Sequence, residues 1–483
     1  MPDATIPTDT SDQPAFFVGI GGSGMMPLAM ILAARGRTVA GSDRSLDQAR
    51  LPAKFDYLRD LGVDLFPQDG SGITSREQVV VASAAIEASV PDMVAAERLG
   101  CARRTRAEML AELFNDSTMP IGVAGTSGKS TVTGMIGWIL HATRRDPTVM
   151  NGAVMKNFAS PNAPFASALV GGGDAFVSEV DESDGSIALF APHVAVLNNV
   201  SLDHKSLAEL NQLFGDFIGK AEVAVINLDN PDGAALARTL DPLRVVGFAI
   251  NADAEVMATD IVEQPFGATF TLAVRGNDPI PVELQVPGRH NIANALAAIA
   301  AARAAGVALD EAAVAIGGFT GLRRRFELVG ETQGVSVLDD FGHNPDKIAA
   351  TLTTLHAFPG RLLILFQPHG YGPLKVMRRE LVDAFAANLK PGDVLILPDP
   401  AYYGGTVARE VTSADIVADL AAKGCDARHI ADRGDAAATI ADLAQSGDRA
   451  IVMGARDDTL SQVAGDILAA IAERPGDPGS SAS

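Results

Sequence analysis

The chain has 483 residues, of which 47% are hydrophobic and 20% charged, and a formal net charge of -21 at pH 7. This length predicts about three domains, and the negative charge excludes a general binder of nucleic-acid backbones. The two cysteines, Cys101 and Cys425, indicate neither a disulfide framework nor a thiolate zinc site, so we expect a cytoplasmic protein.

The first part of the chain predicts a Rossmann-like domain over residues 15–116, after a disordered tail at residues 1–14. Apolar strands and helical stretches alternate here. They are strands at 15–21, 39–43 and 79–82, and helices at 25–34, 90–99 and 106–114. The tail has no apolar signal core and the chain has no apolar run that predicts a membrane span, so we expect no membrane contact.

A glycine loop follows the first strand. Gly19, Gly21 and Gly24 match the pattern G-x-G-x-x-G, and Asp43 falls where an acidic residue can meet a ribose. Taken alone the pattern indicates NAD and an oxidoreductase. UDP fits equally well, because the loop supplies close backbone approach to a diphosphate at a helix start.

The central domain is expected over residues 117–322, and it opens with the sequence IGVAGTSGKSTVTG at Ile121–Gly134. This stretch reads as a strand, a glycine turn and a helix start. The backbone N–H groups of Gly125 to Gly128 can point at phosphate oxygens, Lys129 can reach the outer phosphates, and the Ser130 hydroxyl can hold Mg²⁺. The motif has the short form G-T-x-G-K-S, because Val123 stands where the usual pattern has a glycine.

Acidic residues follow a later strand of this domain, in EVDESDGS at Glu179–Ser186. At the carboxyl end of a strand beside a phosphate loop, they are placed to hold a metal, although a solvated acidic turn is the alternative. His204 follows the strand at 193–200 and is either a metal ligand or structural. The irregular segment 151–173 is interpreted as a loop that faces a substrate and not as core.

A helical run rich in alanine begins at VPGRHNIANALAA. Asn291 and Asn294 stand at its start, where amides either recognise a base edge or cap the helix. Strands at 175–180, 193–200 and 221–227 predict a mainly parallel sheet before it.

A small Rossmann-like C-terminal domain is expected over residues 323–470, followed by a disordered tail at 471–483. The run RRRF at Arg323–Phe326 follows a glycine-rich hinge, GGFTG. A strand at 335–338 ends before Asp340 and His343, and a strand at 361–366 ends before His369. The whole chain is thus predicted to be a three-domain α/β protein.

These motifs together resemble the Mur ligase family. The resemblance covers about residues 15–460 and rests on motifs that occur in the family's order. They are FFVGIGGSGM, VVVASAAI, RAEMLAEL, GVAGTSGKST, EVDESDGS, LDH, VPGRHNIANALAA, FTGLRRRFE, DDFGHNP and FQPH. The GIGGSGM loop and RAEMLAEL favour the branch that joins L-alanine to UDP-N-acetylmuramate.

The resemblance implies a ligase that forms an amide through an acyl phosphate, with ATP and Mg²⁺ as cofactors. Its partners would be a UDP-linked sugar acid, or a similar anionic carboxylate, and an amino acid, on a monomer or weak homodimer. The implied catalytic residues are Lys129, Glu179, His204 and Arg325, and the implied metal ligands are Ser130, Glu179 and His204. The implied ATP-binding residues are Gly125, Thr126, Ser127, Gly128, Lys129, Ser130, Thr131, Asn291, Asn294 and Asp340. The implied substrate-binding residues are Gly21, Gly22, Ser23, Gly24, Asp43, His343 and His369.

The chain also departs from this branch. Ser127 replaces a histidine of the phosphate loop, and Phe341 replaces a tyrosine of the third domain. Gly370 and Pro373 replace two arginines, which removes bidentate carboxylate recognition unless Lys375 or Arg378 compensates. A paralogue with a different amino acid or acceptor is therefore the second hypothesis.

Overall fold

The computed structural model describes residues 13–83, 86–201, 205–401, 409–455, 457 and 459–474. The chain divides into two compact units. Met1–Glu263 and Gly267–Gly321 form unit 1, and Gln264–Phe266 and Leu322–Ser483 form unit 2. Within the described part of the chain, no helix has the length and apolar character needed to cross a membrane.

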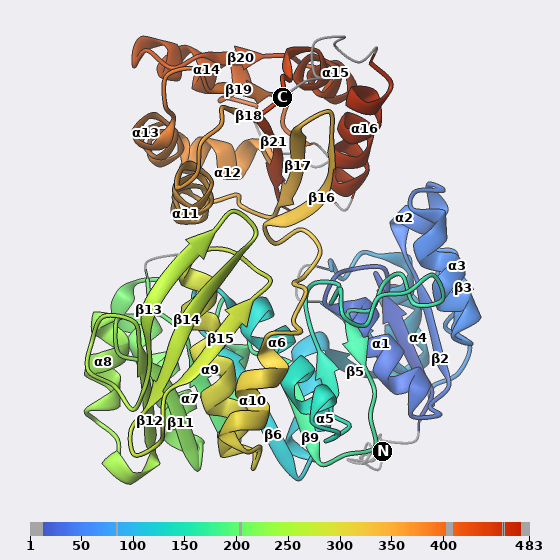
Figure 1. The fold of residues 1–483 in the computed structure, drawn as a ribbon. Helices are drawn as coiled ribbons and strands as arrows, with labels where there is room; N and C mark the ends of the chain where they lie inside the picture. The colour runs from blue at the N-terminus through green and yellow to red at the C-terminus, as the bar shows by residue number, and fades with distance from the viewer. Residues whose placement is uncertain are drawn as a thin grey trace. The chain divides into compact units, whose positions relative to one another are not determined.

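The first sheet of unit 1 is parallel, with strand order β3-β2-β1-β4-β5 (Figure 1, blue). Its strands are β1 (Ala15–Val18), β2 (Val39–Ser42), β3 (Asp64–Phe66), β4 (Val79–Ala82) and β5 (Ala102–Thr105). Its helices are α1 (Met25–Ala34), α2 (Arg44–Asp47), α3 (Pro52–Asp60), α4 (Pro91–Leu99) and α5 (Arg106–Asn115). Strand β1 is buried on both faces, since Phe17 packs into one apolar cluster and Phe16 into another.

The second sheet of unit 1 has the order β15-β14-β13-β12-β11-β10-β6-β9-β7-β8 and is parallel from β13 through β7. Its strands are β6 (Met119–Ala124), β7 (Thr148–Met150), β8 (Ala168–Leu169), β9 (Ala175–Glu179), β10 (Val194–Leu197), β11 (Val223–Asn227), β12 (Val245–Ala249), β13 (Val256–Gln264), β14 (Gly267–Val274) and β15 (Ile280–Leu284). Its helices are α6 (Lys129–Ala142), α7 (Leu207–Lys220), α8 (Pro231–Ala237), α9 (Arg289–Ala304) and α10 (Leu309–Ile316), with short 3₁₀ turns η1 (Ser186–Leu189) and η2 (Pro242–Arg244).

Helix α9 supplies much of the packing behind this sheet. Its alanines are buried, and it contacts α6 and strands β10 to β12 (Figure 1). Small side chains let two helices and a sheet approach closely without voids. The small alanine side chains therefore allow the start of α9 to pack closely against the start of α6.

Unit 2 contains a sheet with the order β16-β17-β21-β18-β19-β20, parallel except for β16 (Figure 1, orange to red). Its strands are β16 (Glu327–Thr332), β17 (Val335–Asp340), β18 (Leu362–Gln367), β19 (Val394–Leu397), β20 (Ala427–His429) and β21 (Arg449–Gly454). Its helices are α11 (Pro345–His356), α12 (Tyr371–Val376), α13 (Arg378–Asn388), α14 (Ser413–Ala422), α15 (Arg433–Leu443) and α16 (Leu460–Ala472). Apolar clusters cover both faces of this sheet.

Two of the boundaries that differ from those expected from the sequence lie in unit 2. Strand β17 continues through Asp340, because its last two residues, Asp339 and Asp340, pair with β21. Helix α16 reaches Ala472, two residues into the expected C-terminal tail. The tails themselves, at residues 1–12 and 475–483, lie outside the described residues.

The segment 151–173 was expected to lie outside the core, and this expectation is wrong. Asn151 and Met155 are fully buried and Ala166 is 3% exposed. The segment also contributes β8, which pairs with β7. Its asparagines Asn151 and Asn157 donate to the backbone of other parts of the chain, at Ser130 and Gly318, whereas residues 160–162 are exposed.

Candidate functional site

The second glycine loop joins β6 to α6 and has the geometry of a phosphate cradle. Gly125 and Gly128 have φ values of +133° and +82°. A Cβ at Gly128 would lie 2.3 Å from the Nδ2 of Asn198 and 2.8 Å from the Oδ1 of Asn294. Glycine is thus required for both conformation and space. The first-turn N–H groups of α6, which have no intrahelical acceptors, can then face an anion.

Lys129 begins α6 and turns back over the loop. Its Nζ donates to the Gly125 carbonyl at 2.7 Å and to Glu182 Oε2 at 2.9 Å. Burial disfavours the charged amine, but the carboxylates of Glu182 and Asp181 outweigh burial and raise the pKa of Lys129. Burial also raises the pKa of Glu182, which its ion pair with Lys129 offsets only in part. Lys129 is therefore a charged ammonium, and it pairs with a carboxylate whose charged form is disfavoured by burial.

Ser130, in the first turn of α6, faces Glu179 at the carboxyl end of β9. The Ser130 hydroxyl donates to Glu179 Oε2 at 2.8 Å, and β9, which ends at Glu179, pairs with β6. Hydroxyl and carboxylate oxygens suit Mg²⁺, which binds through one or two carboxylates together with substrate phosphates. These residues fit the ion. Within the described residues no group of three or more His, Cys, Asp or Glu could hold a metal, and His204 lies outside them.

Asn198 and Asn199, which follow β10, both donate to the Ser127 carbonyl of the phosphate loop. Asn199 accepts from the Ser127 N–H at 2.9 Å and donates to the Ser127 carbonyl and hydroxyl at 3.1 and 2.9 Å. The Thr126 hydroxyl accepts from the Ser201 N–H at 3.0 Å. Thr131 lies half-buried in the first turn of α6. Ser127 therefore contributes to the shape of the loop through its bonds to Asn199.

Asn291 and Asn294 are buried at the start of α9, where they form a chain of amides. Asn198 Nδ2 donates to Ser127 O and to Asn294 Oδ1, both at 3.0 Å. Asn294 then donates to Asn291 at 3.1 Å, and Asn291 donates to Pro287 O at 2.7 Å. The structure thus brings both predicted residues to the phosphate loop and uses their amides within the protein.

The first glycine loop connects β1 to α1. The Gly21 N–H donates to Asp43 Oδ2 at 2.9 Å, and Lys54 Nζ donates to Gly21 O at 3.0 Å. A Cβ on Gly24 would lie 3.0 Å from the Cδ of Arg106, so this loop is also closely packed. Gly22 and Ser23 complete the turn before α1.

Asp43 serves as a structural anchor of this loop. Strand β2 ends at Ser42, and Asp43 is the N-cap of α2, accepting from the Ser45 N–H at 2.7 Å. Both carboxylate oxygens of Asp43 therefore accept from backbone N–H groups. A contact with a ribose would have to share these oxygens.

In unit 2, Asp340 ends β17 and anchors the turns around it. Its oxygens accept from the Phe326 N–H at 2.9 Å, the Gly342 N–H at 3.0 Å and the Thr351 hydroxyl at 2.8 Å. Arg325 lies between two residues with left-handed backbones, Arg324 at φ 58° and Phe326 at φ 48°. Such conformations cost about 1–3 kcal/mol each and are common at functional sites.

An aromatic and cationic cluster follows β17. The guanidinium of Arg325 lies 4.1 Å from the ring centroid of Phe341, and the His343 ring lies 5.4 Å from that of Phe341. His369, just after β18, has its ring 5.3 Å from that of His343. Burial, with the nearby charge of Lys347, lowers the pKa of His343 to about 3. His343 is therefore a neutral imidazole at pH 7.

The nearby Asp339 is fully buried beside Arg324, whose Nε lies 3.4 Å from its Oδ2. Burial raises the pKa of Asp339 to about 6, although the Arg324 charge opposes this shift. Ser461 donates to the same carboxylate at 2.8 Å. Asp339 thus stabilises the turn that carries Arg325.

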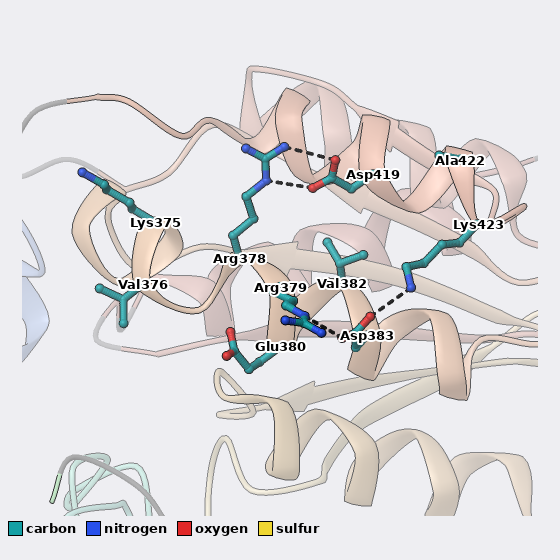
Figure 2. A pocket seen from close by; sticks show the side chains of 10 residues that line it. All are labelled: Lys375, Val376, Arg378, Arg379, Glu380, Val382, Asp383, Asp419, Ala422 and Lys423. Carbon is teal, nitrogen blue, oxygen red and sulfur yellow. Dashed lines mark hydrogen bonds and ion pairs between the residues drawn. The ribbon is translucent and has the colours of Figure 1, made fainter.

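Lys375 and Arg378, the candidate substitutes for the lost arginines, line a surface pocket between α12, α13 and α14 (Figure 2). Arg378 forms a two-pronged pair with Asp419, at 2.7 and 3.1 Å. Lys375 pairs with Glu410 at 2.6 Å, and Lys423 pairs with Asp383 at 2.9 Å. These cations are matched by carboxylates, so the pocket does not have the character of an anion site.

Several residues around the phosphate loop were missed by the sequence analysis. They are Asn151, Asn198 and Asn199. Glu182 lies in the acidic stretch EVDESDGS that was interpreted as a metal site, and in the structure it accepts from Lys129. Asn198 and Asn199 follow a buried strand, and this position could have indicated them. Asn151 lies in the segment taken for a surface loop, and no sequence pattern joins its Nδ2 to the Ser130 carbonyl, 2.9 Å away.

Comparison with known families accounts for most of the chain. Residues 15–118 match the model described as "Mur ligase family, catalytic domain". Residues 123–302 match "Mur ligase middle domain", and residues 324–456 match "Mur ligase, glutamate ligase domain". The matches have the order expected for a three-domain ligase.

Curated relatives extend over nearly the full length. The chain is 36% identical over 459 residues to a UDP-N-acetylmuramate–L-alanine ligase of Streptomyces coelicolor, covering 93% of this chain and 96% of the relative. It is 35% identical over 460 residues to the protein of that name from Paracoccus denitrificans, covering 92% and 94%.

Solved structures show the same fold. A UDP-N-acetylmuramate–alanine ligase from Thermotoga maritima has a TM-score of 0.77 at 22% identity, covering 95% of this chain and 98% of that one. A murein peptide ligase from Psychrobacter arcticus has a TM-score of 0.71 at 22% identity, covering 96% and 99%. With its phosphate loop, its three matched domains and its full-length relatives, this chain belongs to the Mur ligase family of ATP-dependent, C–N bond-forming ligases.

Proposed function

We propose that this protein joins L-alanine to UDP-N-acetylmuramate at the expense of ATP, in peptidoglycan synthesis. The names of the full-length relatives support this pair of substrates. The observation that carries the chemistry is the meeting of Lys129, Ser130 and Glu179 at one phosphate loop. ATP and a UDP-linked substrate also point to the cytoplasm.

ATP would bind with its phosphates on the loop from Gly125 to Thr131. The Lys129 ammonium would leave Glu182 and neutralise the outer phosphates, while Ser130 and Glu179 would hold Mg²⁺, with His204 as a further metal ligand. Mg²⁺ would stabilise the charge that develops on the transferred phosphoryl group. Asn291 and Asn294 would lie beside the adenine base.

Unit 2 would contribute Asp340 near the ATP ribose and Arg325 near the γ-phosphate. Arg325 lies between Arg324 and Phe326, which both have left-handed backbones, and these conformations fix the position of the Arg325 Cα. His343 and His369 would contact the amino acid or the nucleotide. Because His343 is neutral at pH 7, it can accept a hydrogen bond from an ammonium group without repelling it.

UDP would occupy the loop Gly21–Gly24 with its diphosphate at the start of α1. The carboxylate of the sugar acid would attack the γ-phosphate of ATP, which breaks the bond to the bridging oxygen and gives an acyl phosphate and ADP. The amine would then attack the acyl carbon, and phosphate would leave with formation of the amide. Cations are required because three anionic groups must meet.

The test is to incubate the purified protein with ATP, Mg²⁺, UDP-N-acetylmuramate and L-alanine, and to detect the UDP-N-acetylmuramoyl-alanine product by mass spectrometry alongside phosphate release. Lys129→Ala should abolish both signals, since the ammonium acts on the transferred group. Lys423→Ala, which removes a surface lysine of unit 2, is the matched control and should retain both. Absence of product from the wild-type protein would exclude this pair of substrates.

A second candidate keeps the ligase chemistry with another amino acid or acceptor. The observation that favours it is that Lys375 and Arg378, the two candidate substitutes for the arginines expected at Gly370 and Pro373, are each engaged with a carboxylate. Phosphate release with a different amino acid, in a screen of all twenty, would support it. A nicotinamide-dependent oxidoreductase would leave the Lys129 loop without a role.

A further inference from the structure

The residues 151–158, here called the connecting segment, run from the phosphate loop to the end of unit 1. At its far end lie residues 317–321, the hinge segment, which contains the last residue of unit 1 before the chain enters unit 2 at Leu322. Arg325 stands four residues after Gly321. The connecting segment therefore joins two places that the proposed reaction must coordinate.

The near end contacts the residues proposed to hold Mg²⁺. Asn151 is fully buried, and its Nδ2 donates to the Ser130 carbonyl at 2.9 Å. Its Oδ1 accepts from the Ala153 N–H at 3.0 Å, which fixes the amide. The Cα of Gly152 faces Glu179 so closely that an added Cβ would lie 2.1 Å from Glu179 Oε1. A movement of Ser130 or Glu179 must therefore displace this end.

The far end is bonded to the hinge segment by Asn157. Its Nδ2 donates to Gly318 O at 2.7 Å, and its Oδ1 accepts from the Thr320 N–H at 2.9 Å and from the Thr320 hydroxyl at 3.1 Å. The Lys156 N–H donates to Gly321 O at 3.1 Å. One amide thus engages the hinge segment at Gly318 and Thr320.

The middle of the connecting segment is held in the protein interior. Met155 is fully buried, and its N–H donates to Ala166 O at 2.9 Å. Phe158 packs against Trp138 of α6, with ring centroids 6.0 Å apart. Trp138 itself donates to Ala315 O at 2.7 Å and lies against Gly318, so helix α6 supports the same hinge segment. The segment is half-buried apart from the fully buried Asn151 and Met155, and its bonds at both ends and at Met155 restrict its conformations, so that it can transmit a displacement.

We propose that the connecting segment couples nucleotide binding at Ser130 and Glu179 to the conformation of the hinge segment, with Asn157 as the positioning residue of this link. Asn157 acts through the backbone of residues 318–321 and touches no reacting atom. The proposal rests on the nucleotide-binding part of the proposed function and is independent of which amino acid is used. Its physical basis is a contiguous set of contacts with a bonded residue at each end.

Hydrogen exchange measured by mass spectrometry tests the link, with the full chain alone and with the non-hydrolysable analogue AMP-PNP and Mg²⁺. In the wild-type protein, the analogue should slow exchange in peptides of the phosphate loop and also in peptides covering residues 317–321. In Asn157→Ala, protection of the phosphate loop should remain and the response of residues 317–321 should disappear. A purely structural role would speed exchange of the hinge segment equally with and without nucleotide.

Two variants complete the design. Asn157→Asp retains the acceptor for Thr320 but cannot donate to Gly318, so it should show a partial response. Asn277→Ala removes an exposed asparagine whose Nδ2 donates to Arg275 O at 3.3 Å, and it should behave as wild type. In turnover assays, Asn157→Ala should lower kcat by about threefold to thirtyfold while the KM for ATP changes little.

The outcomes separate the two proposals. If the analogue fails to protect the phosphate loop of the wild-type protein, nucleotide binding there is wrong and the proposed function fails. If the loop is protected but residues 317–321 do not respond, or respond equally in Asn157→Ala, the link is wrong and the proposed function stands. Fluorescence of Trp138, the one tryptophan of the chain, gives an independent reading at the same place.

Discussion

Replacement of Asn198 by aspartate tests the chain of amides behind the phosphate loop. Asn198 is 4% exposed, and its Nδ2 donates to both Ser127 O and Asn294 Oδ1 at 3.0 Å. Its own Oδ1 has no hydrogen-bond partner. Aspartate has the same shape but cannot donate in its charged form. We therefore expect Asn198→Asp to destabilise unit 1 more than truncation to alanine does.

The magnitudes follow from the contacts. Alanine removes two hydrogen bonds, each contributing about 1 kcal/mol, but it also removes an unpartnered acceptor that costs about 1–3 kcal/mol. Alanine also leaves Asn294 Oδ1 without this donor, and that cost offsets the gain from removing the unpartnered acceptor, so the net loss for Asn198→Ala should be about 2 kcal/mol. Aspartate places a buried charge against two oxygen atoms, so we expect a loss of about 3–5 kcal/mol, comparable to leaving a buried charge unpaired.

Urea denaturation followed by tryptophan fluorescence is suited to this comparison. Trp138 is the one tryptophan of the sequence and lies on α6, the helix that begins at the phosphate loop. The free energy of unfolding should decrease in the order wild type, Asn198→Ala, Asn198→Asp. Burial should raise the pKa of the new carboxyl group, so Asn198→Asp should regain stability as the pH falls and the group becomes a neutral donor.

A result in which Asn198→Asp equals Asn198→Ala at pH 8 would refute the reasoning. It would mean that the Oδ1 and Nδ2 atoms of Asn198 occupy each other's positions, or that water reaches the site and hydrates the aspartate charge. Equal stability of all three proteins would mean that the amide chain does not hold the loop.

Three further predictions concern other sites. Gly152→Ala should push Glu179 away from Ser130 and raise the Mg²⁺ concentration needed for half-maximal activity about tenfold or more, whereas Gly219→Ala, in open space, should have no effect. The pKa of His343 is about 3 in the folded protein and 6.5 in a model peptide, so below pH 6.5 the unfolded chain binds a proton at this histidine while the folded protein does not. The free energy of unfolding should therefore decrease as the pH falls below 6.5. His343→Asn should therefore show a smaller decrease of the urea midpoint, followed by circular dichroism, between pH 7 and pH 5. Arg378→Ala should leave the KM for the amino acid unchanged, since its guanidinium pairs with a surface carboxylate; a tenfold increase would contradict this assignment.

The strand, glycine turn and helix start of the phosphate loop were predicted from the sequence and are found in the structure. Its glycines, Lys129 and Ser130 are adjacent in the chain, and the strand before them and the helix after them have strong patterns. The limits of α1, Met25–Ala34, and of β4, Val79–Ala82, were predicted to the residue for the same reason.

The contacts between distant residues could not be predicted. Asn198 and Asn294 are 96 positions apart, and their bond depends on the packing of α9 against β10, the strand that Asn198 follows. The role of Asn151 depends on a segment whose composition suggested a surface loop. Asp43 has the expected position at the end of a strand, but whether its oxygens face a ligand or the backbone depends on the turn of the glycine loop.

The pairing of Lys129 with Glu182 has a consequence for how the enzyme exchanges protons with its solvent. When a phosphate takes the ammonium, Glu182 loses its counter-charge while it stays in a position where burial already raises its pKa. The pKa of this carboxyl group should then rise further, so nucleotide binding should strengthen as the pH falls towards that pKa and Glu182 takes up a proton. In that pH range the heat of binding would depend on the ionisation enthalpy of the buffer.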